Sequence, residues 1–242
     1  MTLTIKNLTG GYSQLPVLKD INFEINDGEL VGLIGLNGAG KSTTIKEIIG
    51  LLQPQKGSIE IDGLTLKENP EEYRKKIGYI PESPALYEEL TLREHLEVTA
   101  MAYDIPQDIA LQRAEQLLKT FRLENRLEWF PANFSKGMKQ KVMILCAFLI
   151  EPSLYIIDEP FLGLDPLAIH ALLELMKAMK ASGASILMST HVLATAEKYC
   201  DRFIMLHNGE IRAQGSMAEL QQQFGLANAS LDEIYLALTE EA

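Results

Sequence analysis

One glycine-rich segment, GLNGAGKS at residues 35–42, constrains the fold of this chain more than any other feature. It fits the pattern G-x-x-x-x-G-K-[S/T]. It also lies between an apolar run at 29–35, typical of a buried strand, and a predicted helix from about residue 41 to 51. Glycines let the backbone curl so that its N–H groups point inward, and the start of a helix attracts anions. The segment therefore predicts a phosphate-binding loop on an α/β sheet.

The side chains of this segment indicate a nucleoside triphosphate held with a magnesium ion. Lys41 can reach the terminal phosphates, and the Ser42 hydroxyl can hold Mg²⁺. The same glycines could form a tight turn without a ligand, but the strand before them and the helix after them favour the phosphate site. We expect the nucleotide to contact Asn37, Gly38, Ala39, Gly40, Lys41, Ser42 and Thr43.

A second apolar strand, predicted at 154–157, ends in the two carboxylates Asp158 and Glu159. Behind a phosphate-binding loop, this arrangement places Asp158 near the Mg²⁺ and Glu159 beside the γ-phosphate. Glu159 is our candidate general base, because its carboxylate can polarise an attacking water. An acidic pair at a strand end can also be ordinary solvated surface, and the loop at 35–42 favours the catalytic interpretation.

The wider pattern alternates strands with helices, which predicts a largely parallel sheet covered by helices. Between residues 84 and 151 the pattern becomes helical only, and it begins with a capping box at Thr91 and Glu94. Ser216 and Ser230 are predicted N-caps of two C-terminal helices. Strands are expected near 18–25, 29–35, 58–61, 77–80, 154–157, 185–188, 203–206 and 210–212.

This pattern predicts one domain with three parts. We expect an α/β nucleotide-binding core at 1–83 and 152–215, a helical insertion at 84–151 and a C-terminal helical extension at 216–242. The length of 242 residues is enough for a sizeable core.

Composition and charge exclude several classes of protein. The net charge of −11, with 33 acidic against 22 basic residues, argues against nucleic acid as a partner, because phosphate backbones require clustered Lys and Arg. The longest apolar run, at 142–150, is too short to span a membrane. The first residues lack the features of a signal peptide, so we expect a cytoplasmic protein.

A phosphate-binding loop with these acids also fits a kinase, a GTPase or a recombinase-type ATPase, so other motifs decide the class. FSKGMKQ at 134–140 opens a predicted helix and resembles the LSGGQ signature of ABC ATPases. Asp165, after a glycine, is similar to the aspartate of the family's D-loop. His191, beyond a predicted strand, is similar to its switch histidine, and Tyr12 to its adenine-stacking aromatic.

In isolation each of these residues has a structural explanation. Ser135 could be a plain N-cap, His191 a surface residue and Tyr12 an aromatic of a turn or core. Their complete order along the chain favours the resemblance, which covers about residues 3–214.

The resemblance to ATP-binding subunits of ABC transporters implies a P-loop NTPase (RecA-like) core with an antiparallel β-subdomain and an inserted α-helical subdomain. It implies ATP and Mg²⁺ as ligands, with Lys41, Glu159 and His191 in catalysis. Ser135, Lys136, Gly137 and Asp165 would contact the nucleotide of a second copy in a head-to-tail homodimer. The partner would be a polytopic membrane permease, which would hold this chain on the inner face of the cell membrane. The process would be export, with peptides as one substrate class. The alternatives are an ABC ATPase acting on the ribosome or DNA, and a protein that binds ATP only as a structural ligand.

Two positions depart from the family's usual pattern. Glu82 stands where the Q-loop glutamine is usual. Its carboxylate can ligate Mg²⁺ as an amide oxygen can, but when ionised it cannot donate a hydrogen bond. The alternative is that Glu82 faces solvent. Lys136 replaces the first glycine of the signature, where it either approaches the opposite nucleotide or is simply exposed. The segment 83–90 is the expected docking surface for a permease helix, with Leu86 and Tyr87 as anchors, unless these side chains cover the core.

Overall fold

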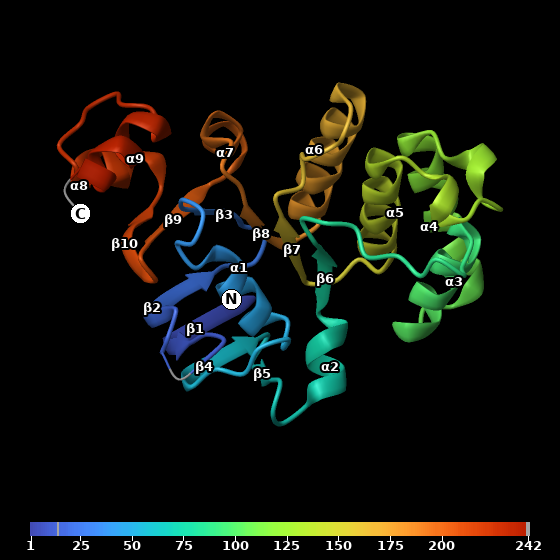
Figure 1. The fold of residues 1–242 in the computed structure, drawn as a ribbon, viewed down its shortest axis with the longest axis horizontal. Helices are drawn as coiled ribbons and strands as arrows, with labels where there is room; N and C mark the ends of the chain where they lie inside the picture. Colours follow the sequence, from blue (N-terminus) through green and yellow to red (C-terminus); the bar gives the residue numbers. More distant parts are fainter. Residues whose placement is uncertain (14, 241–242) are drawn as a thin grey trace.

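Two β-sheets organise the part of the chain that the computed structural model describes, residues 1–13 and 15–240 (Figure 1). One sheet is four-stranded and antiparallel, in the order β2-β1-β4-β5. The other is six-stranded, in the order β10-β9-β3-β8-β7-β6. The strands are β1 Leu3–Gly10, β2 Leu18–Ile25, β3 Leu30–Ile34, β4 Lys56–Ile61, β5 Leu64–Thr65, β6 Ile77–Ile80, β7 Leu154–Asp158, β8 Ser185–Ser189, β9 Arg202–His207 and β10 Glu210–Gly215.

The six-stranded sheet is parallel except at one edge, where β10 runs antiparallel to β9. This confirms the sheet that the alternating pattern predicts. Its central strands β3, β7 and β8 are buried along their whole length, because both faces of a parallel sheet are covered. The side chains of β7 alternate between the two faces: Tyr155 and Ile157 belong to one apolar cluster, and Leu154 and Ile156 to the other.

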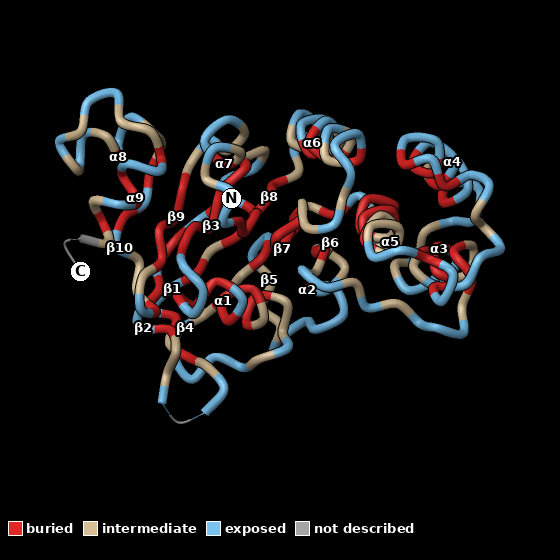
Figure 2. Tube along the Cα trace, turned by 45° about the horizontal axis from the view of Figure 1, so that its top comes forward, coloured by how far each residue is buried: buried red, intermediate tan, exposed pale blue. Residues whose placement is uncertain are grey.

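The helices divide between the two faces and one end of this sheet (Figures 1 and 2). One apolar cluster joins α3, α4, α5 and α6 to the sheet, and a second fills the space between the two sheets around α1. A third cluster joins α7, α8 and α9 to β9 and β10. The helices are α1 Lys41–Ile48, α2 Pro70–Lys75, α3 Leu92–Ala102, α4 Gln107–Phe121, α5 Lys136–Leu149, α6 Pro166–Ala181, α7 Leu193–Tyr199, α8 Met217–Gln223 and α9 Leu231–Glu240, with 3₁₀ turns at Glu124–Arg126 and Pro131–Asn133. Among the described residues, none of these helices is both long and apolar enough to cross a bilayer.

The predicted helix starts are confirmed. Thr91 and Glu94 form both bonds of a capping box at the start of α3, and Ser216 caps α8. The predicted end of the first helix at residue 51 is wrong: α1 ends at Ile48, and Gly50 then adopts a φ of 77°, which breaks the helix.

Strand β1 is absent from the sequence prediction. Its inward apolar residues, Leu3, Ile5 and Leu8, do not keep a strict period of two, because Asn7 has a φ of 50° and the pairing register shifts between Ile5 and Leu8. A bulge of this kind hides the alternation by which a strand is usually found.

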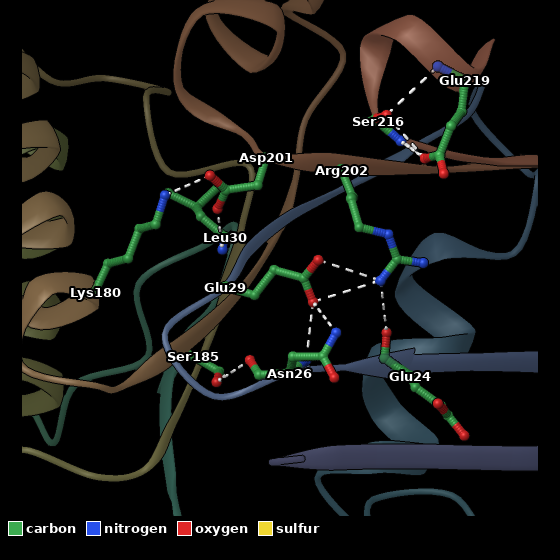
Figure 3. A network of polar contacts seen from close by, with 10 residues as sticks. All are labelled: Glu24, Asn26, Glu29, Leu30, Lys180, Ser185, Asp201, Arg202, Ser216 and Glu219. Atoms are coloured by element: carbon green, nitrogen blue, oxygen red, sulfur yellow. Dashed lines mark hydrogen bonds and ion pairs between the residues drawn. The ribbon is translucent and has the colours of Figure 1, made fainter.

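A polar network fastens the edge of the parallel sheet at which β3, β8 and β9 begin (Figure 3). Asp201 accepts a hydrogen bond from the Leu30 N–H at 2.8 Å and pairs with Lys180 of α6 at 2.5 Å. Arg202 pairs with Glu29 at 3.2 Å, directly before β3. These contacts fix the starts of the strands, which leaves their carboxyl ends free to carry other chemistry.

One buried carboxylate lies between the two sheets without any hydrogen-bond partner among the described atoms. Glu47 of α1 is 2% exposed, and neither of its carboxylate oxygens is bonded. It lies under Gly10, where a Cβ would come within 2.0 Å of Oε1. Burial raises the pKa of Glu47 from 4.5 to about 7.

We therefore expect Glu47 to destabilise the fold as the pH rises. Between about pH 4.5 and 7 the folded chain binds more protons than the unfolded chain, so the free energy of unfolding falls across this window. Glu47→Gln should raise the free energy of unfolding by roughly 1–3 kcal/mol at pH 8 and change it little at pH 4.5. Urea unfolding of the wild type and of Glu47→Gln at both pH values measures the difference in the free energy of unfolding. The exposed Glu24→Gln serves as control. If Glu47→Gln raised the free energy of unfolding equally at both pH values, the raised pKa of Glu47 would be contradicted.

Candidate nucleotide site

The loop that joins β3 to α1 has the backbone shape of a phosphate-binding loop. Gly38 and Gly40 have φ values of 85° and 115°, in the left-handed region that favours glycine. At Gly40 a Cβ would also approach the Leu18 side chain to 2.7 Å. Lys41 begins α1 and is buried, and its Nζ donates to the Gly35 carbonyl at 2.7 Å and the Leu36 carbonyl at 3.3 Å.

Strand β7 delivers Asp158 to the same edge of the sheet. Ser189, at the end of the neighbouring strand β8, donates a hydrogen bond to the Asp158 carboxylate. Burial raises the pKa of Asp158, the Ser189 hydrogen bond opposes that rise, and the negative charge of Glu82 adds to it. The charges of Glu159 and Lys41 also act on this carboxylate, so the structure brings these predicted site residues together.

Glu159 and His191 form a direct pair at the carboxyl ends of β7 and β8. The His191 Nδ1 lies 2.8 Å from Glu159 Oε2, and the His191 backbone N–H donates to the same oxygen at 3.3 Å. Glu159 is buried and has a φ of 46°, a left-handed conformation that costs on the order of 1–3 kcal/mol for a non-glycine residue. Strain of this kind is common where a side chain must be aimed at a ligand.

The oxygen atoms at this edge fit a magnesium ion. The Ser42 hydroxyl is exposed at the start of α1, and the carboxylates of Asp158 and Glu82 lie close enough for their charges to interact. Mg²⁺ prefers oxygen ligands and usually takes only one or two carboxylates together with phosphate oxygens. The donor set of Ser42, Asp158 and Glu82 meets that requirement.

Tyr12 is 60% exposed near the start of the loop that follows β1, so its ring is open to stacking. Its hydroxyl accepts a hydrogen bond from Lys46 at 2.9 Å. Lys46 belongs to α1, and it went unpredicted because a lysine in a helix carries no signal of such a contact. The pairing ties the aromatic ring to the helix that begins with Lys41.

The signature segment begins α5 and lies apart from α1, beyond β7 and β6 in both views (Figures 1 and 2). Ser135 is the N-cap of α5 and accepts a hydrogen bond from the Met138 N–H at 3.2 Å, as expected. A Cβ on Gly137 would lie 2.3 Å from the Gly163 carbonyl oxygen, so Gly137 is required by close backbone packing. Lys136 is exposed, with its side-chain carbons beside Gly163.

Asp165 links the signature helix to α6. One carboxylate oxygen caps α6 through the Ala168 N–H at 2.9 Å, and the other pairs with Lys141 of α5 at 2.8 Å. The Lys141 hydrogen bond, followed by the Ala168 N–H, lowers the pKa of Asp165. Both oxygens of the Asp165 carboxylate therefore have partners in the same chain.

The loop that carries Glu82 is held by the signature helix. The buried Gln140 of α5 donates from Nε2 to the Pro81 carbonyl at 3.3 Å, next to the exposed Glu82. This role of Gln140 could not be predicted from the sequence, since the contact joins segments far apart in the chain. Of the two expected anchors, Leu86 packs partly on the core, whereas Tyr87 is 66% exposed.

The fold and this site define an ATP-binding cassette. A sequence model of the ABC transporter family matches residues 18–162, and the chain belongs to this family. It is 65% identical over 239 residues to the ABC-type transporter ATP-binding protein EcsA of Bacillus subtilis strain 168, covering 99% of this chain and 97% of that protein.

Two solved structures extend the comparison. An ATP-binding subunit of an ABC transporter aligns with a TM-score of 0.97 at 62% identity, covering 99% of this chain and 100% of that chain. A dimeric ATP-binding cassette in a post-hydrolysis state, bound to ADP and Pi, aligns with a TM-score of 0.80 at 28% identity, covering 89% of this chain and 98% of that chain. The predicted P-loop fold with an antiparallel sheet is confirmed.

The close approach of Gly137 to Gly163 predicts that a larger residue at position 137 destabilises the fold. Helix propensity alone predicts that Gly137→Ala raises the free energy of unfolding by up to about 1 kcal/mol. The added Cβ would overlap the Gly163 carbonyl, so we expect a net loss of about 1–3 kcal/mol. Urea unfolding decides the sign, with Lys136→Ala as a control that only removes atoms. A stabilised Gly137→Ala would contradict the packing argument.

Proposed function

We propose that this chain binds ATP with Mg²⁺ and hydrolyses it to ADP and phosphate, and that hydrolysis drives transport by a separate membrane permease. The observation that carries the proposal is the Glu159 and His191 pair at 2.8 Å, held beside Asp158 at the edge of the sheet where the phosphate-binding loop begins. A carboxylate in this position can polarise a water for in-line attack on the γ-phosphate.

Each predicted residue has a role in this reaction. Lys41 and the N–H groups at residues 37–43 neutralise and orient the phosphates, and Tyr12 stacks on the adenine. Bound Mg²⁺, held by Ser42, Asp158 and Glu82, would neutralise phosphate charge. His191 holds the Glu159 carboxylate in place through its ring nitrogen.

Two copies act together in this proposal. The signature residues Ser135, Lys136 and Gly137, with Asp165, face the nucleotide of the second copy. This assignment is supported by the place of α5, which lies apart from α1, beyond β7 and β6 (Figures 1 and 2). The relative solved as a dimer with ADP and Pi supports this arrangement. Hydrolysis at Glu159 then lets the dimer reopen.

The membrane partner is a polytopic permease of the EcsB type, inferred from the similarity to EcsA. We divide the chain into an ATP-binding core at 1–83 and 152–215, a helical part at 84–151 and an extension at 216–242. We assign the docking of the permease to the helical part. A cavity of about 660 Å³ between α3 and α4 supports this, since it is large enough for apolar side chains of a partner helix. Met101 and Leu111 line it and are largely exposed. The chain would lie on the cytoplasmic side of the membrane, bound through the permease, and the process would be export, with peptides as one substrate class.

Glu159→Gln tests the chemical step. Removing a general base lowers a rate about 10²- to 10⁴-fold, so phosphate release should fall by at least about 100-fold while ATP binding persists. Phosphate assays and ATP titrations measure the two effects. Glu24→Gln, an exposed change on β2, should leave turnover unchanged. If wild-type chain with its permease releases no phosphate, ATP is only a structural ligand.

The partner decides between transport and the alternative of an ABC ATPase acting on ribosomes or DNA. We expect the tagged chain to co-purify from detergent-solubilised membranes with a polytopic membrane protein. Tyr87→Glu should reduce that recovery, because it replaces an exposed aromatic ring with a charged carboxylate. Recovery with ribosomes or DNA in its place would overturn the transport function.

A further inference from the structure

The C-terminal helix α9 packs against the ATP-binding core, at the opposite end of the molecule from the helices α3 to α5 (Figure 1). Its buried residues Leu231, Ile234 and Leu238 share an apolar cluster with Ile34, the last residue of β3, and Ala196 of α7. A helix seated in this way reaches the loop that begins at Gly35.

The first turn of α9 is also fixed by polar contacts. The Leu231 N–H donates to the Glu197 carboxylate of α7 at 2.8 Å, and the Ser230 N–H donates to Glu233 at 2.7 Å. Because α7 closely follows His191, α9 is anchored to the segment that carries the switch histidine. The helix is therefore a rigid platform, suited to holding a side chain in one place.

Tyr235 lies on the buried side of α9. It is 8% exposed and belongs to the same apolar cluster as Ile34. Its hydroxyl is fully buried and makes no hydrogen bond of normal geometry to any described atom. The backbone N–H of Leu36 faces it, and this N–H opposes the rise in the pKa of Tyr235 that burial causes. A buried hydroxyl without a bond is costly, so it gains by taking a nearby donor.

The Leu36 N–H and the Gly35 carbonyl belong to one planar peptide unit. The Gly35 carbonyl accepts the hydrogen bond from Lys41 Nζ at 2.7 Å. Tyr235 and Lys41 thus face the two ends of the same peptide. The Lys41 ammonium has three N–H donors, so a donor that turns to a phosphate is no longer available to the Gly35 and Leu36 carbonyls. A contact at the N–H end of the peptide would then help to keep its orientation.

We propose that Tyr235 is a positioning residue of the ATP site, whose hydroxyl accepts a hydrogen bond from the Leu36 N–H when nucleotide is bound. The bond fixes the Gly35–Leu36 peptide, and so the start of the phosphate-binding loop, while Lys41 shares its donors between this peptide and the phosphates. Through α9 the loop is also coupled to α7 and the segment of His191. The inference rests on the proposed ATP binding and assigns a role to the C-terminal extension.

Tyr235→Phe tests the hydroxyl while keeping the ring. ATP titrations of the purified chain should show a Kd raised about two- to tenfold, the range of one neutral hydrogen bond. In amide ¹H–¹⁵N spectra, the Leu36 resonance should move downfield on ATP addition in the wild type and move less in Tyr235→Phe. Tyr155→Phe is the matched control, because Tyr155 is another buried tyrosine whose hydroxyl is unbonded among the described atoms.

The outcomes separate this inference from the function on which it rests. An unchanged Kd and an unchanged Leu36 shift in Tyr235→Phe overturn the positioning role while ATP binding stands. An equal loss of affinity in Tyr155→Phe also overturns it, because the effect would then be general to the core. Failure of the wild-type chain to bind ATP overturns the proposed function itself.

Discussion

The parallel pairing of β3, β8 and β7 is the constraint on which the rest of the structure depends. Leu30 to Leu33 pair in register with Ile186 to Ser189, and these pair in turn with the strand that ends at Asp158. Parallel strands end at the same edge, so this pairing places three distant segments side by side. The loop at 35–40, the acids after β7 and His191 after β8 meet only for this reason.

The groups at that edge show how the fold manages buried charge. Asp158 has Ser189 as a hydrogen-bond donor and Lys41 as a nearby cation, and Glu159 has His191. Glu47 has no such partner in the described part of the chain, and the pKa of this carboxyl rises to about 7. The carboxylates at the sheet edge have hydrogen-bond partners or nearby cations, so they can stay ionised and take part in a reaction. The ionised form of Glu47, beneath Gly10, only opposes folding.

The elements outside the sheet act by fixing loops. Lys46 holds Tyr12, Gln140 holds the Pro81 carbonyl beside Glu82, and Glu197 holds the first turn of α9. Each contact joins a helix to a segment that is remote in sequence or lacks a structure of its own. The positions of the loops that carry Tyr12 and Glu82 therefore depend on contacts with helices.

The sequence by itself determined the α/β class, most strands of the parallel sheet, the helix caps and the identity of the phosphate-binding loop. These follow from local rules: the apolar period, the capping residues and the glycines that a tight loop needs. It did not reveal β1, because the bulge at Asn7 breaks the period. Only the tertiary structure decided which side chains meet, as in the hydrogen bond of Ser189 to Asp158 and the packing of α9 in one apolar cluster with Ile34. Such contacts depend on strand order and helix packing, which no local pattern of residues encodes.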